Sequence, residues 1–126
     1  MTETGLTIDE ILDDFSDYAG EESRRSTSVN SVSPDGETPL HWMSTLGDAR
    51  AIELLVGAGA NVNAQDTNGN APLHAAVQSR QLQAVEALVQ SGANLLLPNS
   101  AGFTPLELSQ QEAFQPVLRY LERKTP

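Results

Sequence analysis

The sequence predicts an all-α protein of three helix-turn-helix units stacked in a row, because one motif returns twice at a constant spacing. Thr38-Pro39-Leu40-His41 recurs as Ala71-Pro72-Leu73-His74 and again as Thr104-Pro105-Leu106-Glu107, a step of 33 residues each time (38 to 71 to 104). A glycine precedes each copy by two residues, at Gly36, Gly69 and Gly102. Such a period indicates supersecondary units that bury their apolar faces against one another.

The register continues beyond the motif, through Gly59-Ala60-Asn61 and Gly92-Ala93-Asn94. A 33-residue period with a Thr-Pro-Leu-His core, a Gly-Ala-Asn turn and the tail Asn61-Val62-Asn63-Ala64 resembles the ankyrin repeat over about residues 33–124. The resemblance implies an ankyrin-repeat solenoid at 34–126, with repeats at about 34–66, 67–99 and 100–124. It implies a protein-binding surface without naming the partner, because such arrays bind many unrelated proteins.

Residues 1–20 are expected to form an N-terminal amphipathic cap helix. Thr7 and Glu10 have the Thr-x-x-Glu spacing of a capping box, so the helix should begin there and run to about residue 19, before Gly20. One face is apolar, with Ile8, Ile11, Leu12, Phe15 and Tyr18. The first repeat has the bulky Trp42 and Met43 where the second has Ala75 and Ala76, and we expect the N-terminal helix to cover them.

Residues 21–33 are rich in serine and are predicted to be a mobile linker. Two arginines precede several hydroxyls in Arg24-Arg25-Ser26-Thr27-Ser28, a pattern compatible with phosphorylation that Ser-rich linkers also show by chance.

Each repeat should contain two antiparallel helices, the first opened by a proline whose missing N–H has no intrahelical partner at that position. The predicted pairs are 39–46 with 49–57, 72–79 with 82–90, and 105–112 with 114–123. Apolar residues of the second helices should form the core between repeats: Ile52, Leu55, Val56, Val85, Leu88, Val89, Val117, Leu118 and Leu121. Glu107 in place of histidine and a polar last helix (Arg119, Glu122, Arg123, Lys124) mark a terminal capping repeat.

The composition limits the classes of partner. The formal net charge is −10, of which residues 1–33 carry −6 (eight acids, two bases) and residues 34–126 carry −4 (nine acids, five bases). This balance argues against direct nucleic-acid binding, which rests on Lys and Arg contacts, and favours one basic protein partner, although acidity also serves solubility alone. No apolar run is long enough to cross a membrane and residues 1–5 lack a signal-peptide pattern, so we expect a cytoplasmic protein, monomeric before it binds its partner.

Catalysis, metals and cofactors find no support in the sequence. There is no cysteine, and the resemblance gives His41 and His74 the structural role of hydrogen bonding the backbone of a neighbouring turn. The aspartates of the first helix lack the pattern of a calcium loop. No nucleophile with an identifiable base appears, so we expect neither an enzyme nor a cofactor.

The resemblance instead places the binding surface on the loop tips and on the exposed ends of the first helices. The corresponding residues here are Glu37, Leu46, Asp48, Asn70, Gln78, Ser79, Phe103, Gln111 and Glu112. Phe103 is expected to be an exposed aromatic anchor, with local packing as the alternative.

Two functions fit these features. The first is an inhibitor that binds one basic partner, similar in build to bacterial immunity proteins that neutralise a toxin. The second is a regulatory adaptor in intracellular signalling whose linker is modified.

Overall fold

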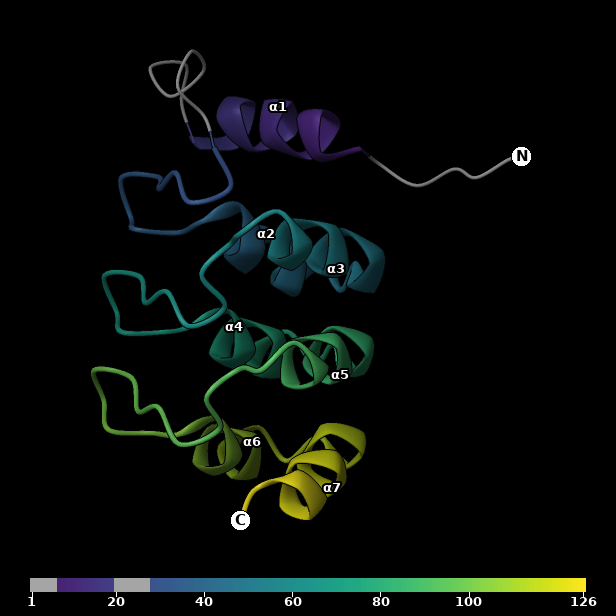
Figure 1. Ribbon diagram of the computed structural model, residues 1–126. Coiled ribbons are helices and arrows are strands. Elements are labelled where there is room, and N and C mark those ends of the chain that lie inside the picture. Colours follow the sequence, from purple (N-terminus) through teal and green to yellow (C-terminus); the bar gives the residue numbers. More distant parts are fainter. Residues whose placement is uncertain (1–6, 20–27) are drawn as a thin grey trace.

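The computed structural model describes residues 7–19 and 28–126, and within them it is all α-helical with no strand, as predicted. A single helix precedes three helix pairs that follow one another along one axis (Figure 1). The helices are α1 (Ile8–Ala19), α2 (Pro39–Leu46), α3 (Ala49–Gly57), α4 (Pro72–Gln78), α5 (Leu82–Gln90), α6 (Pro105–Glu112) and α7 (Gln115–Lys124). The predicted helix limits agree with these to within one residue.

Two rows of helices make up the stack. The first helices α2, α4 and α6 form one row, the second helices α3, α5 and α7 form the other, and the loops before α2, α4 and α6 project to one side (Figure 1). The core between the rows contains the predicted Ile52, Leu55, Val85, Leu88, Val117 and Leu121, whereas Val56, Val89 and Leu118 are half-buried. Each unit therefore buries its apolar surface against its neighbours, which is how a repeat array gains stability.

The start of each first helix follows from its motif. The Thr38 hydroxyl accepts from the His41 N–H, and Pro39 supplies the first helical residue without a wasted donor. The same arrangement opens α6, where Thr104 accepts from the Glu107 N–H. In α4 the N-cap residue is Ala71, which has no side-chain acceptor, so this helix lacks that hydrogen bond.

Helix α1 covers the exposed end of the first repeat, as expected. It packs on α2 and α3, with Ile11 and Phe15 fully buried. The Phe15 ring lies against Trp42, with ring centroids 6.3 Å apart and an interplanar angle of 53°. The Thr7 and Glu10 capping box is present at its start. The side chain of Tyr18, predicted for the same face, lies outside the described part.

The prediction of a mobile linker fails for residues 28–33, because they already belong to the repeat register. Asn30 donates its side-chain N–H to the Gly59 carbonyl and accepts from the Asn61 N–H at 2.8 Å. Asn63 repeats the second of these bonds one unit later, with the Asn94 N–H at 2.7 Å. Asn30 and Asn63 are 33 residues apart, so the period itself carried this signal. Residues 21–27, with the Arg24 to Thr27 hydroxyl segment, lie outside the described residues.

The last repeat has the polar outer side that was predicted. Arg119, Glu122, Arg123 and Lys124 are exposed on α7, with Arg123 and Lys124 close to the Tyr120 ring. None of the described helices combines the length and the apolar character that crossing a membrane requires.

Candidate partner-binding surface

Each loop tip is a turn held by the side chain of its first residue. Ser33, Asp66 and Asn99 occupy the same register, 33 residues apart. The side-chain oxygen of each accepts the backbone N–H groups two and four residues later, at 2.9 to 3.2 Å. The glycine at each apex has a positive φ of 76 to 89°, a conformation that glycine adopts without strain.

The three tips also bond to one another, so they form a continuous row. The Thr67 N–H donates to the Asp35 carbonyl at 3.1 Å, and the Ser100 N–H donates to the Asn68 carbonyl at 3.0 Å. Gln65 adds a side-chain bond to the Pro98 carbonyl. Because backbone groups on both sides of each tip are satisfied, the tips present one fixed edge of the molecule.

The two histidines connect successive units, as the resemblance implied. His41 Nε2 donates to the Asn70 carbonyl at 2.7 Å, and His74 Nε2 donates to the Phe103 carbonyl at 2.9 Å. In both residues Nδ1 accepts a backbone N–H, from Thr38 and from Ala71. This pattern assigns the proton to Nε2. Glu107 occupies the third position, where it accepts the Thr104 N–H and has no later unit to bond.

Burial lowers the pKa of His74 below the usual value for histidine. Its hydrogen bond to Phe103 and the nearby Asp66 carboxylate act in the opposite direction, and His41 adds a smaller lowering effect. Desolvation is the largest of these effects, so the neutral imidazole is the form that the folded protein stabilises.

The residues predicted for partner binding do lie on the tips and on the ends of the first helices, but they differ in exposure. Leu46, Gln78 and Gln111 are exposed, and 56% of Leu46 is accessible. The half-buried members are Glu37, Asp48, Asn70, Ser79, Phe103 and Glu112.

Three half-buried members have structural contacts. The Asp48 carboxylate caps α3 by accepting the Ala51 N–H at 3.0 Å. Asn70 Oδ1 accepts from Asn99 Nδ2 at 3.0 Å, which ties two adjacent tips together. Glu112 lies 4.0 Å from Arg80 in a largely exposed ion pair, a contact that contributes little to stability.

Phe103 differs from the expectation of an exposed aromatic. It is half-buried and its side chain packs against the hydrophobic core. The reason is its place at the base of the tip, where its N–H bonds to Asn99 and its carbonyl to His74, while Ser100, Ala101 and Gly102 form the outer part. A role of Phe103 in partner binding stays a prediction.

Arg80 was not singled out from the sequence. It follows α4 at the position that is Gly47 after α2 and Ala113 after α6, and all three have positive φ. Its guanidinium lies 5.9 Å from the centre of the Phe114 ring and faces Glu112 in the next unit. The aligned positions 47, 80 and 113 were the available signal.

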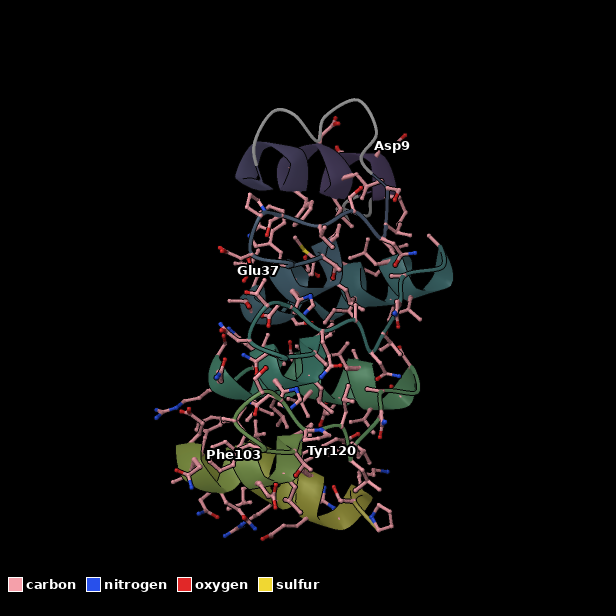
Figure 2. All side chains as sticks on the ribbon, turned by 90° about the vertical axis from the view of Figure 1, so that its left-hand side faces the viewer. Asp9, Glu37, Phe103 and Tyr120 are labelled. Atoms are coloured by element: carbon pink, nitrogen blue, oxygen red, sulfur yellow. The ribbon has the colours of Figure 1, made fainter. Side chains whose placement is uncertain are left out.

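The net charge is divided unequally along the stack. Residues 1–66 contain thirteen acidic and three basic residues, a charge of −10, while residues 67–126 contain four of each and sum to zero. Figure 2 views the loop tips and shows Asp9 at the acidic end, with Glu37 below it and Phe103 and Tyr120 towards the other end. Because chain order is order along the axis, the negative charge gathers on α1 and the first repeat. Within the described residues up to 66, Arg50 is the one base.

Among the described residues, no three His, Asp or Glu side chains are placed to hold a metal ion together. Comparison with curated proteins finds no match. A model of ankyrin repeats in three copies matches residues 16–99 and again residues 40–124. Together with the helix pairs, the histidine bonds between units and the stacked tips, this match shows that the chain belongs to the ankyrin repeat family.

Proposed function

We propose that this ankyrin-repeat protein is a non-catalytic inhibitor that binds one basic partner protein through its loop tips and first-helix ends. Ankyrin repeats are protein-binding modules, and the proposal adds the sign of the partner's charge and a one-to-one complex. The version closest to the resemblance is a cytoplasmic immunity protein that neutralises a toxin whose active cleft is basic.

The observation that carries the proposal is the position of the net charge. All ten units of negative charge lie in residues 1–66, where α1 exposes Asp9, Glu10, Asp13 and Asp14 and the first tip exposes Asp35. A general solubilising charge would need no such segregation. A basic surface that approaches this end gains attraction over several side chains at once.

The fixed geometry of the tips also supports a binding role. Each tip has its own turn bonds and a backbone bond to the next tip. A surface that is already ordered loses little conformational entropy when a partner docks, so more of the interaction free energy appears as affinity.

The test is capture of a partner by the tagged protein from its native cell, followed by reconstitution of the purified pair. We expect one stable one-to-one complex whose affinity falls steeply between 50 and 300 mM salt (on the order of tenfold or more), because exposed charge pairs are screened. A variant with Asp9, Asp13 and Asp14 replaced by Asn should bind more weakly and show a shallower salt dependence. An affinity independent of salt contradicts the basic-partner proposal.

The regulatory adaptor is the alternative, and the same capture separates the two. Several partners, or capture that depends on phosphorylation of residues 21–33, would favour the adaptor over the inhibitor.

A further inference from the structure

The first repeat combines, on one first helix and its tip, an exposed apolar side chain with acidic groups. Leu46 is 56% exposed at the last residue of α2, and Trp42 lies one turn earlier on the same face, half-buried beneath α1. The tip that leads into α2 has Asp35, which is exposed, and Glu37, which is half-buried. Residues four apart on a helix are neighbours, so Trp42 and Leu46 form one apolar face.

The other repeats lack this combination. The positions of Glu37 and Leu46 correspond to Asn70 and Ser79 in the second repeat, neither of them charged or apolar. In the third repeat they correspond to Phe103, which packs against the core, and to Glu112, which pairs with Arg80. An apolar group at the helix end and a carboxylate at the tip therefore occur together only in the first repeat.

We propose that this face, resting on the protein-binding function proposed above, binds an extended segment of the partner that has one apolar residue and a Lys or Arg three or four residues away. Leu46 and Trp42 receive the apolar side chain, and Asp35 with Glu37 receives the cation.

The length of α2 sets the spacing. Pro39 and Leu46 are seven residues apart, which is about 10 Å along an α-helix at ~1.5 Å per residue. An extended segment advances about 3.3 Å per residue, so three residues cover about the same distance. A cation directly beside the apolar residue would fall short of the tip, and one six residues away would pass beyond it.

Charge complementarity selects the cation over an anion. Helix α1, whose Phe15 ring contacts Trp42, exposes four carboxylates at the same end of the stack. The basic residue that the structure describes up to residue 66, Arg50, pairs with Glu53 on α3. An acidic segment would meet repulsion from every side of this face, whereas a basic one meets attraction.

The experiment is selection of linear peptides from a random phage-displayed library on the immobilised full chain. Enriched peptides should share an apolar residue and a Lys or Arg three or four positions away. Synthetic copies should change the fluorescence of Trp42, the single tryptophan, since they would cover it. A copy with the cation moved to six positions away should bind roughly tenfold more weakly.

Matched variants locate the site. Leu46→Ala should weaken the selected peptides by roughly tenfold, as for a central apolar anchor. Asp35→Asn combined with Glu37→Gln should weaken them and flatten their salt dependence. The controls at the same register of the second repeat, Ser79→Ala and Asn68→Ala, should bind as the parent does. Thermal melts establish that each variant is folded.

Three results would overturn the proposal: no enrichment of linear peptides, enriched peptides without a cation at that spacing, or equal binding by Leu46→Ala. In each case a salt-dependent one-to-one complex with the captured partner would still support the inhibitor, so the two proposals fail separately. Loss of that complex with intact peptide binding would reject the inhibitor alone.

Discussion

At the scale of single residues, the two histidines show how one side chain joins two repeats. Each imidazole accepts an N–H from the start of its own helix and donates to the carbonyl at the base of the next tip. Only the neutral ring can do both, because the protonated ring has no acceptor. A buried protonated His74 would leave the Ala71 N–H without its partner and place an uncompensated charge in the core.

The pH dependence of stability follows from the lowered pKa of His74. As the pH falls below about 6.5, the unfolded chain takes up a proton that the folded protein resists, so the free energy of unfolding should decrease. Urea unfolding at pH 7.5 and pH 5.5 measures this loss. His74→Gln, whose amide can both accept and donate, should show a smaller loss over the same interval. Identical losses in the two proteins would exclude His74 as the cause.

Residue-level prediction succeeded where the repeat fixes a position and failed where packing decides it. The bonding role of both histidines and the burial of the second-helix core were predictable, because a residue that recurs at 33-residue spacing has the same surroundings each time. Exposure of Phe103 was not predictable. Its position matches Glu37 and Asn70, yet a phenyl ring gains free energy from turning towards apolar neighbours that a carboxylate or amide avoids.

At the scale of secondary-structure elements, the three first helices differ in how their N-termini are satisfied. Thr38 and Thr104 cap α2 and α6 with a hydroxyl, whereas Ala71 leaves α4 without one. Thr38 is as buried as Ala71, so the same site in another unit already accommodates the larger side chain.

We expect Ala71→Thr to stabilise the protein by about 1 kcal/mol, the usual worth of an N-cap hydroxyl. For a chain of this size that corresponds to a rise in melting temperature of roughly 3 to 6 °C. Thr104→Ala, made at the same register of α6, should lower the melting temperature by a similar amount. A lower melting temperature for Ala71→Thr would mean that the core around α4 cannot accept the added atoms.

Helix α1 stabilises the stack through its buried face, and Phe15→Ala tests this. Removing a fully buried phenyl ring typically costs about 3 to 5 kcal/mol. Because the ring covers Trp42, the tryptophan emission should also shift to longer wavelength in the folded variant. Asp13→Ala, an exposed position on the same helix, should change neither property much. Equal effects of the two substitutions would show that α1 does not stabilise the stack through this contact.

At the scale of the whole molecule, the solenoid keeps the charge of one sequence half on one half of the structure. In a fold with extensive crossing of the chain, acidic residues from early segments would mix with basic residues from late ones. Here residues 1–66 retain −10 and residues 67–126 sum to zero. Like charges crowded on α1 and the first repeat repel one another and destabilise that end.

Salt should therefore act in opposite directions on the free protein and on its complex. Raising NaCl from 20 to 200 mM should increase the melting temperature of the isolated chain, because screening relieves repulsion among the carboxylates. The same change should weaken the complex with a basic partner. Replacing Asp9 and Asp13 by Asn should reduce both effects. A melting temperature that falls with added salt would show that attractive pairs dominate the electrostatics of the free protein.

The stacked order of the repeats has one more consequence, for the way in which two molecules meet. With one half at −10 and the other neutral, the protein has an electric dipole along its long axis. In the field of a cationic body it would rotate until the α1 end points forward, while still separated by solvent. The angle of approach is then selected before any side chains touch, and a larger share of diffusional collisions begins in the productive orientation.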